Sequence, residues 1–478
     1  MIGGGLAGPE AALTAARLGC EVDLYEMRAV VDGKPRLTPA HQTTDFGELV
    51  CSNSLKSELE YTAPWLLKEE MRRFGSALLR IADETAVPAG HALAVDRVEF
   101  SRRITEAIQA EPRIRVIREE VTSLDDALFQ DENGTKCQDQ EKTKCRCTVV
   151  ATGPLTSEAL SQEIERLTGA GHLAFYDSIS PIVDAESIDM SRVYFAARWD
   201  KGTADYINCP MDRVEYGRFY DALVAAEAAE SKEWEKLECF APHAPESGAW
   251  GPRYFEGCLP IEVLAARGRD TLRFGPMKPV GLRDPRTGKR PWAVVQLRKE
   301  NLRASSYNLV GFQNHLKFGE QARVLRLIPG LENAQFLRYG QIHRNTYIRA
   351  PALLDETLSL KNSATRIMFA GQICGVEGYT ESIATGMLAG IYGAAMARGE
   401  EPGPVPRTTA LGSLVHYITH ADAKGFQPAN ITFDLLEPLE EEVRKKIRDK
   451  KERRRLQCER ALAAFDAWRA NQPVACSR

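Results

Sequence analysis

The sequence predicts an α/β fold in which a dinucleotide-binding domain is assembled from separated stretches of the chain. Gly3-Gly4-Gly5-Leu6-Ala7-Gly8 satisfies the pattern G-x-G-x-x-G, a helical pattern follows over 9–18, and a short apolar strand then ends at Glu26. Two later apolar strands, at 147–153 and 368–372, also run into glycine turns. A parallel sheet that holds a nucleotide beyond the carboxyl ends of its strands accounts for all three stretches.

The glycine motif has a local physical logic. Gly3 and Gly5 permit a tight turn and a close approach of the backbone to a pyrophosphate, while Gly8 lets helix and strand pack closely. The helix N-terminus faces the anion, and Glu26 is expected to accept hydrogen bonds from ribose hydroxyls. An ordinary glycine turn before a helix is the alternative. The helix, second strand and terminal acid in register favour the dinucleotide site.

The first strand of this unit is short. A buried parallel strand of about five residues should precede Gly3, but only Met1 and Ile2 stand before it. Either the first strand is short or the chain is trimmed at its start. A trimmed strand would weaken the centre of the sheet and with it the retention of a dinucleotide.

Composition limits the class of protein. The 478 residues are enough for two or three domains, and the net charge of −4 means that nucleic acid could be bound only by a local patch. No run of eighteen apolar residues is present, so a soluble, cytoplasmic protein is expected. The eleven cysteines include no C-x-x-C pair and are expected to be thiols. The spacing of Cys137, Cys145 and Cys147 does not suit a metal site, and none is predicted.

The next elements follow from periodicity and turn residues. Val30–Glu48 is polar and contains prolines, so it is predicted to be a loop. One helix is predicted after it, because apolar residues recur at i, i+4 and i+7 from Leu67 to Ile81. Beyond it we expect, in order, a strand at 91–95, a helix at about 97–110, a strand at 113–117, a polar surface excursion at 125–146 and a buried strand at 147–150.

The return to the first sheet near residue 370 makes the dinucleotide domain discontinuous. The prediction is a two-dinucleotide-binding-type flavoprotein with a Rossmann-like FAD domain, an inserted α+β domain rich in Pro, Trp and Tyr, and a C-terminal helical segment. The predicted boundaries are 1–171 for the first part of the FAD domain, 172–329 for the inserted substrate or RNA domain, 330–400 for the second part of the FAD domain, and 401–478 for the C-terminal segment.

The C-terminal segment carries a basic patch. Arg444–Arg455 contains nine Lys or Arg against Asp449 and Glu452, a net charge of +7 on a stretch expected to be helical. A solvated helix face is the alternative for any charge run. On an otherwise acidic chain, this stretch is the best candidate for contact with a phosphate backbone.

Several long blocks in collinear order then resemble one family. DFGELVCSNSLKSE, FEGCLPIEVLAARGRDTLRFGPMKPVGL, YGQIHRNTYI and FAGQICGVEGYTES are similar to the TrmFO family of folate- and FAD-dependent tRNA (uracil-5-)-methyltransferases. The resemblance implies methylation of C5 of the T-loop uridine of tRNA, with the T-arm as the RNA partner. It implies 5,10-methylenetetrahydrofolate as one-carbon donor, reduced FAD as reductant, and NAD(P)H to recharge the flavin.

Two cysteines match the functional pair of the family. They are Cys51 in ELVCSNSLKS and Cys258 in FEGCLPIE. C5 of uracil is a poor nucleophile until a group adds to C6, and a thiolate adds and leaves reversibly. Cys51 is assigned the nucleophilic role, with Lys56 expected to favour its thiolate. Cys258 is expected to be a second thiol at the uracil, and the division of roles between the two stays open, as does a purely structural role.

Other residues match the region of the family where pterin and flavin stack. His343 in IHRNT and Tyr379 in GVEGYTES each offer a flat face and a polar edge for such stacking. Gly371 and Gln372 complete the expected cofactor contacts. Cys374 stands where the family is expected to carry a hydroxyl group, which would place a third thiol near the flavin.

Alternative functions remain at this stage. A ribosomal RNA uracil-5-methyltransferase of the same family is the nearest one. The wobble-uridine activity of the related MnmG proteins is disfavoured, because the chain lacks their C-terminal extension. An NAD(P)H-dependent flavin oxidoreductase without RNA substrate would need neither Cys258 nor the basic patch. An RNA-binding protein with a vestigial flavin fold is the last alternative.

Overall fold

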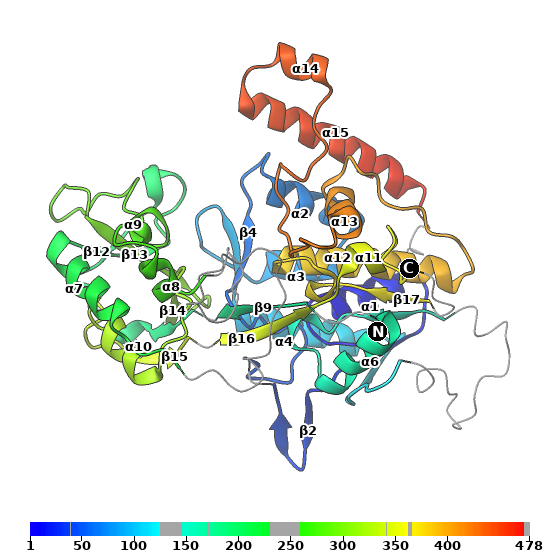
Figure 1. Cartoon of the computed structure of the whole chain (residues 1–478), viewed down its shortest axis with the longest axis horizontal. Coiled ribbons are helices and arrows are strands. Elements are labelled where there is room, and N and C mark those ends of the chain that lie inside the picture. Colours follow the sequence, from blue (N-terminus) through cyan, green and yellow to red (C-terminus); the bar gives the residue numbers. More distant parts are fainter. Residues whose placement is uncertain are drawn as a thin grey trace.

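The computed structural model describes residues 1–38, 40–124, 146–169, 173–178, 180–229, 259–340, 342–361 and 366–472. Two bodies lie side by side, each with its own hydrophobic core (Figure 1). The larger body contains both the N-terminal stretch and residues beyond 345, and the smaller body lies between them in sequence. A long C-terminal helix projects from the larger body on the side opposite the hairpin that carries β2 (Figure 1).

A parallel sheet lies at the centre of the larger body. Residues 1–3 form its middle, because Ile2 bridges in parallel to Tyr25 on one side and to Val150 on the other. The Ile2 amide donates to the Val149 carbonyl at 2.8 Å, and the Gly3 amide donates to the Tyr25 carbonyl at 2.8 Å. The short first strand therefore pairs on both sides. The order across the sheet is β7 (Ile114–Ile117), β1 (Val22–Tyr25), residues 1–3, β8 (Thr148–Val150) and β17 (Ile367–Phe369).

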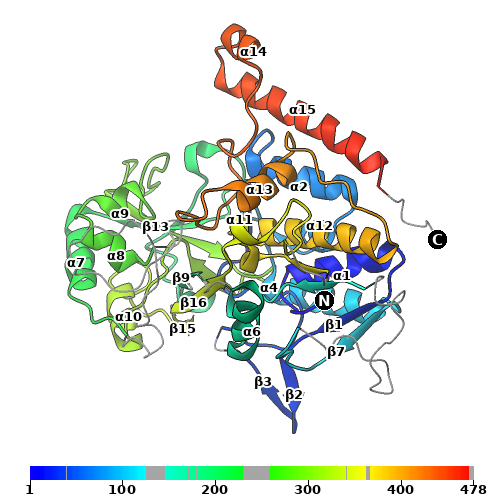
Figure 2. The same ribbon diagram turned by 45° about the vertical axis from the view of Figure 1, so that its right-hand side comes forward.

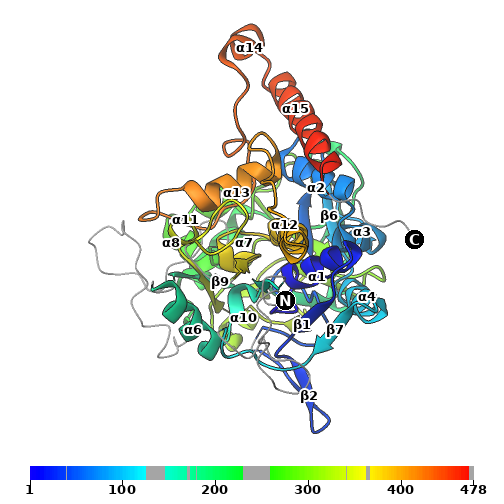
Figure 3. The same ribbon diagram turned by 90° about the vertical axis from the view of Figure 1, so that its right-hand side faces the viewer.

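Helices α1 (Ala7–Arg17) and α12 (Tyr379–Ala397) pack on each other beside this sheet (Figure 3). A Cβ atom at Gly386 would lie 2.3 Å from the Ala7 carbonyl oxygen, so only glycine permits this approach. Within the glycine turn, a Cβ atom at Gly8 would lie 1.8 Å from the Gly3 oxygen. The two glycines hold α1 against its strand and against α12.

Two predictions for the following segment are wrong. The single helix expected from Leu67 to Ile81 is two helices, α2 (Ala63–Phe74) and α3 (Ala77–Glu84), because Gly75 takes a left-handed φ of 87° and ends α2. The expected loop over 30–48 begins with a hairpin of β2 (Ala29–Val31) and β3 (Lys34–Arg36). The remaining elements of this body are β4 (Ser54–Ser57), β5 (Ala86–Val87), β6 (Ala92–Val95), α4 (Arg97–Ala110), α6 (Glu158–Thr168), β9 (Leu173–Ser178), β16 (Ile342–Tyr347) and α11 (Ala350–Leu353).

The smaller body is built on a six-stranded antiparallel sheet. Its strand order is β11 (Tyr194–Phe195), β12 (Ile207–Met211), β13 (Ala293–Lys299), β14 (Ser306–Leu309), β10 (Ile182–Asp184) and β15 (Phe336–Arg338). The helices of this body are α7 (Arg213–Val224), α8 (Ile261–Ala266), α9 (Thr271–Phe274) and α10 (Phe318–Leu325). The predicted surface excursion at 125–146 falls, up to residue 145, outside the described residues.

The C-terminal segment forms α13 (Ala410–His420), α14 (Glu441–Lys446) and α15 (Lys450–Ala470). The basic stretch is therefore not one helix, because it is interrupted at 447–449, where Asp449 caps α15. The second half of α15 packs on α2, with Arg73 paired to Asp466. Within the described ranges, no helix combines the length and apolar character that a bilayer crossing requires.

Candidate active site

A deep cleft opens at the carboxyl ends of the parallel strands. It encloses about 970 Å³ of empty space when its open mouth is included. Segments far apart in the sequence meet there. Its walls include Ile2–Ala7, Tyr25–Arg28, His41, Glu48, Val50, Glu119–Val121, Ala151–Ser157, Gly371, Gln372, Tyr379 and Ser382.

The glycine turn forms the floor of this cleft. Gly3, Gly4, Gly5, Leu6 and Ala7 all line it, and α1 begins at Ala7. A Cβ atom at Gly5 would meet no atom within 4 Å, so the backbone is open to a ligand there. An open backbone at a helix N-terminus suits a pyrophosphate. The predicted glycine contacts are therefore placed together as expected, and the cradle fits a dinucleotide.

Glu26 lies in the cleft wall, but neighbouring groups already occupy its carboxylate. The Gly4 amide donates to Oε2 at 2.6 Å, and Arg28 donates to Oε1 from its amide at 2.8 Å and from Nε at 3.0 Å. A third contact from Arg28, from Nη2, reaches Oε2 at 3.4 Å. A carboxylate accepts about four hydrogen bonds, so a ribose hydroxyl would have to displace this longest one.

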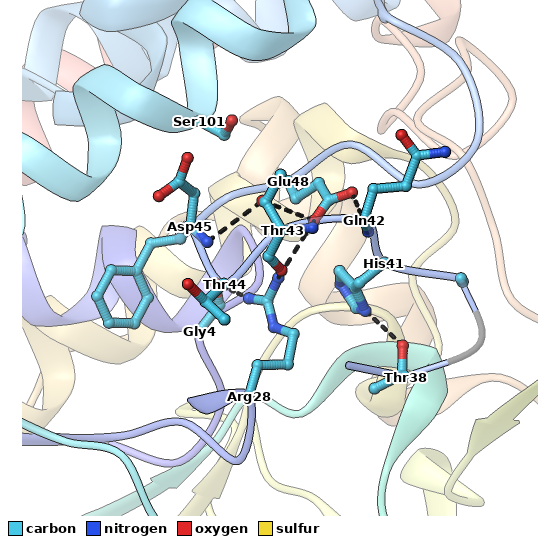
Figure 4. A network of polar contacts seen from close by, with 12 residues as sticks. Gly4, Arg28, Thr38, His41, Gln42, Thr43, Thr44, Asp45, Glu48 and Ser101 are labelled. Carbon is cyan, nitrogen blue, oxygen red and sulfur yellow. Dashed lines mark hydrogen bonds and ion pairs between the residues drawn. The ribbon is translucent and has the colours of Figure 1, made fainter. Parts of the chain in front are cut away.

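Arg28 is a cleft residue that sequence analysis missed. Its side chain is 2% exposed and lies between Glu26 and Glu48, at 3.5 Å from Glu48 Oε2. Glu48 in turn accepts hydrogen bonds from the Gln42 and Thr43 amides, at 2.8 and 3.0 Å (Figure 4). The feature of the sequence that could have identified Arg28 is its position, two residues after Glu26, the acid that follows the strand. Arg28 is therefore a buried cation in the cleft wall, paired with two carboxylates.

The opposite wall comes from the late strand–glycine–helix unit. Gly371 and Gln372 follow β17, and the Gln372 side chain donates to Glu377 at 2.8 Å. Tyr379 is the first residue of α12 and also lines the cleft. Its hydroxyl accepts a hydrogen bond from the Cys51 amide at 2.7 Å. The cleft therefore brings the predicted nucleophile loop next to the predicted flavin wall.

Arg97, which the sequence did not single out, contacts the Cys51 loop at two backbone carbonyls. The guanidinium donates to the Leu49 carbonyl and, at 3.2 Å, to the Cys51 carbonyl, while Nε pairs with Glu300 at 2.9 Å. Lys56 bonds Glu381 at 2.6 Å and Asn430 at 2.7 Å, and its expected effect on the Cys51 thiol stays a prediction. Arg97 is thus a cation that holds this loop.

Two arginines set the electrostatic environment of this loop. Burial alone would lower the pKa of Arg97, but Glu300, Tyr379 and Cys51 together raise it. Burial lowers the pKa of Arg338, and the positive charge of Arg97 adds to that effect. Tyr379, Glu48 and Cys51 act on Arg338 in the opposite direction. Arg338 therefore faces the same group of side chains from the smaller body.

Three further predicted residues have different outcomes. Cys374, predicted to place a third thiol near the flavin, is buried; its thiol lies 3.0 Å from the Gly371 carbonyl oxygen, and burial raises its pKa to about 12, which disfavours a thiolate. His343 lies in β16, where its backbone pairs with Asp177 of β9. Cys258 falls outside the described residues.

The fold and the cleft define an α/β protein of the FAD-dependent oxidoreductase-like class. Residues 1–401 match the family model described as Glucose inhibited division protein A. The form II crystal structure of GidA from Aquifex aeolicus is similar with a TM-score of 0.64 and 18% sequence identity, covering 98% of this chain and 73% of that one. At this identity the likeness supports the fold alone, and the predicted fold class is confirmed.

Within this class, the chain belongs to the TrmFO family. A relative from Koribacter versatilis (strain Ellin345) is 64% identical over 476 residues, which cover 99% of this chain and 98% of that protein. A relative from Solibacter usitatus (strain Ellin6076) is 59% identical, with 98% of each chain covered. Both are named methylenetetrahydrofolate–tRNA-(uracil-5-)-methyltransferase TrmFO. The predicted family is thereby confirmed.

Proposed function

We propose that this protein methylates C5 of the T-loop uridine of tRNA in the cytoplasm. The one-carbon donor is 5,10-methylenetetrahydrofolate, the bound cofactor is FAD, and NAD(P)H is the source of electrons. The observation that carries the proposal is the 64% identity to a relative of that name over 99% of this chain. The cleft supports the proposal, because one end suits a dinucleotide and the other holds a cysteine loop.

Different residues of the cleft bind different parts of FAD in this proposal. The open backbone at Gly5 and the N-terminus of α1 bind the pyrophosphate, and Glu26 with Arg28 holds the ribose end. Gly371, Gln372 and Tyr379 lie along the wall for the flavin ring. When bound, the reduced flavin supplies the hydride that converts a methylene to a methyl group.

Cys51 is the proposed nucleophile, and its loop is built to favour a thiolate. A cation near a thiol stabilises its anionic form, and both Arg97 and Arg338 interact electrostatically with Cys51. The Tyr379 hydroxyl fixes the Cys51 backbone at 2.7 Å. Cys258 acts as the second thiol, and His343 stacks with the folate ring.

The decisive experiment incubates purified protein with unmodified tRNA transcript, methylenetetrahydrofolate, NADH and FAD, and detects 5-methyluridine by mass spectrometry after nuclease digestion. Product confined to the T-loop is expected. Cys51→Ser should keep its bound flavin and lose product, whereas the matched control Cys20→Ser, at a half-buried thiol away from the cleft, should keep both. Activity in Cys51→Ser would remove this residue from the mechanism.

The other outcomes identify the alternatives. Product on ribosomal RNA but not on tRNA would point to the sister activity. Oxidation of NADH in air without methylation of either RNA would leave an NAD(P)H-dependent flavin oxidoreductase. A colourless protein that binds RNA would support the vestigial flavin fold.

The proposed tRNA contact is a cationic cleft between α2 and the C-terminal helices. Arg444, Lys450, Arg453 and Arg454 line it, and the Arg454 guanidinium lies 4.8 Å from the centroid of the Phe433 ring. Phosphate contacts of this kind depend on counterion release and weaken with salt. An aromatic ring beside arginines also suits an exposed base.

Replacing Arg444, Lys450, Arg453 and Arg454 together by Gln should weaken tRNA affinity. It should also lower the slope of log K against log salt by about 0.7–0.9 for each phosphate that is no longer neutralised. The matched control, with the same change in charge, replaces the exposed Arg80, Arg102, Arg103 and Arg115 by Gln. Equal affinity and slope in the two variants would contradict the assignment of this cleft.

A further inference from the structure

Two histidines and a carboxylate meet on the surface of the larger body, outside the cleft. His416 and His420 lie one turn apart on α13, and Glu356 comes from the segment after α11. Each residue offers one ligand atom, and these three atoms lie within 4.8 Å of one another. Helices α11 and α13 are neighbours, so the two elements meet along a packed contact (Figure 2).

Hydrogen bonding at His420 shows which ring nitrogen carries the lone pair. The Thr419 hydroxyl donates to the Val415 carbonyl at 2.8 Å, so its oxygen is left to accept. His420 Nδ1 lies 2.9 Å from that oxygen, and the neutral tautomer assigned from this network carries its proton on Nδ1. Nε2 is then the lone-pair nitrogen, and it lies 3.7 Å from a carboxylate oxygen of Glu356. With that tautomer, two electron-rich atoms face each other, and a metal cation between them would make the arrangement favourable.

The backbone on either side of Glu356 forms a closed turn. Asp355 Oδ1 accepts hydrogen bonds from the Thr357 amide at 2.8 Å and from the Ser359 amide at 3.1 Å. Leu354 and Leu360 form an antiparallel bridge across the base of this turn. The carboxylate therefore projects from a closed turn rather than from a long loop.

We propose that Glu356, His416 and His420 bind one Zn²⁺ ion, with water in the fourth position. Two imidazoles and a carboxylate suit zinc, whereas Mg²⁺ and Ca²⁺ prefer sites made only of oxygen. Zinc–ligand bonds of about 2.0–2.2 Å require the ligand atoms to approach to roughly 3.4 Å of one another. The His416 and His420 rings are stacked with their centroids 4.3 Å apart, so binding requires side-chain rotation, for which the 49% and 48% exposed Glu356 and His420 side chains have room.

In such a site, the Thr419 hydroxyl would accept a hydrogen bond from the metal-bound imidazole of His420 without contacting the ion itself. A metal-bound imidazole donates its other N–H to an oxygen, which fixes the tautomer and the orientation of the ring. The ion would also tie α13 to the turn that precedes β17. That turn is bonded to the strand, since the Leu360 amide donates to the Ile367 carbonyl at 2.8 Å.

The test is a calorimetric titration of ZnCl₂ into tag-free holoenzyme. One ion per chain is expected, with an affinity that falls at least tenfold in His416→Ala, in His420→Ala and in Glu356→Gln. Thr419→Val should lose about 10- to 100-fold, the range typical of outer-sphere partners. The matched control is His91→Ala, which removes an exposed histidine elsewhere on the chain and should leave binding unchanged.

A second measurement distinguishes the proposed site from zinc bound elsewhere on the chain. Zinc should raise the melting temperature of the wild type and of His91→Ala, but not that of His416→Ala. Zinc binding that persists in all three ligand variants would place the ion elsewhere on the chain and overturn the proposal. No binding at a one-to-one ratio would show that His420 and Glu356 form only an ion pair, which also overturns it.

Discussion

Buried carboxylates at helix N-termini join distant parts of the chain. Glu10 accepts hydrogen bonds from the Ala77 and Leu78 amides at the start of α3, at 3.3 and 2.8 Å. Glu70 does the same for α13, where the Ala410 and Leu411 amides donate at 2.7 and 2.9 Å. Each carboxylate satisfies backbone donors that have no partner within their own helix. Burial outweighs these bonds and raises the pKa of both groups.

Glu70 should make the stability of the fold depend on pH. Its pKa is raised to about 8, so the folded chain keeps a proton that the unfolded chain releases above about pH 4.5. Stability is thus lost as pH rises from about 4.5 to 8, by at most ~1.4 kcal/mol per pH unit. Glu70→Gln has no such proton to release. Its free energy of unfolding should therefore rise relative to that of the wild type as pH increases across that range. Urea unfolding at pH 5, 6.5 and 8 measures the difference.

Glu99→Gln is the matched control. Hydrogen bonds from Arg102 and Arg103 lower the pKa of Glu99 to about 2, so this group is ionised in both states above pH 5. The difference between Glu99→Gln and wild type should therefore not change from pH 5 to 8. A wild-type curve parallel to that of Glu70→Gln would show that Glu70 is ionised in the folded protein.

The glycine turn, Glu26, Gly371, Gln372 and Tyr379 could be placed in one cleft from the sequence alone. Each belongs to a short pattern in which a strand, a turn and a helix follow one another in the chain. Arg97 and Arg338 could not be placed, because their contacts with the Cys51 loop join elements far apart in sequence. A lone arginine at the start of a helix carries no signal of such contacts. The roles assigned to the predicted site residues stay predictions.

At the scale of elements, the cleft depends on how closely α12 approaches α1. Gly386→Ala would place a methyl group 2.3 Å from the Ala7 oxygen, against a backbone that cannot move aside cheaply. We expect a loss of about 1–3 kcal/mol in unfolding free energy. Dinucleotide retention should also weaken, since α1 carries the floor of the cleft. Thermal unfolding and flavin content after dialysis measure the two effects.

Gly319→Ala serves as the matched control for this change. Gly319 lies in α10, and a Cβ atom there would meet nothing within 4 Å. Alanine in an open helical position should raise stability by up to about 1 kcal/mol and leave flavin content unchanged. If Gly386→Ala left the unfolding free energy unchanged, α1 and α12 would be able to move apart without loss of stability.

Elements with strong periodicity were predicted well, and those decided by a single residue were not. The helix expected at about 97–110 is α4 (Arg97–Ala110), and the strand expected at 113–117 is β7 (Ile114–Ile117). The break between α2 and α3 was missed because the apolar spacing continues across Gly75, and only its left-handed backbone interrupts the helix. The break between α14 and α15 was missed because charge, not hydrophobic spacing, defined that stretch.

At the scale of the whole molecule, a buried polar junction joins the two bodies beside Cys51. Asn53 is fully buried, and its amide donates to the Val95 carbonyl of the larger body and to the Lys299 carbonyl of the smaller one, both at 2.9 Å. Asn308 donates to the Asn53 oxygen at 3.3 Å. The boundaries predicted at 171 and 329 stay predictions, but this junction shows how the bodies are held together.

Asn53→Ala should loosen the junction. It leaves two buried carbonyls without a partner, at a cost of about 1–3 kcal/mol. Hydrogen exchange should quicken at the ends of both β6 and β13, which exchange measured by mass spectrometry would detect. The matched control Asn301→Ala removes bonds to Ser305 within one turn and should affect that turn alone. Faster exchange in only one body would show that Asn53 does not couple the two.

The interleaved sheet also determines the order in which the protein is able to fold during its synthesis. The smaller core comes from one run of the chain and is complete before β17 is made. The cleft instead needs Gly3 and Tyr379 together, about 370 residues apart. At a synthesis rate of 5–20 residues per second, roughly 20–75 s pass between the synthesis of the glycine turn and the synthesis of Tyr379. During that interval the nascent chain displays the apolar face of α1 uncovered, and this protein should depend on chaperones more than its final compactness implies.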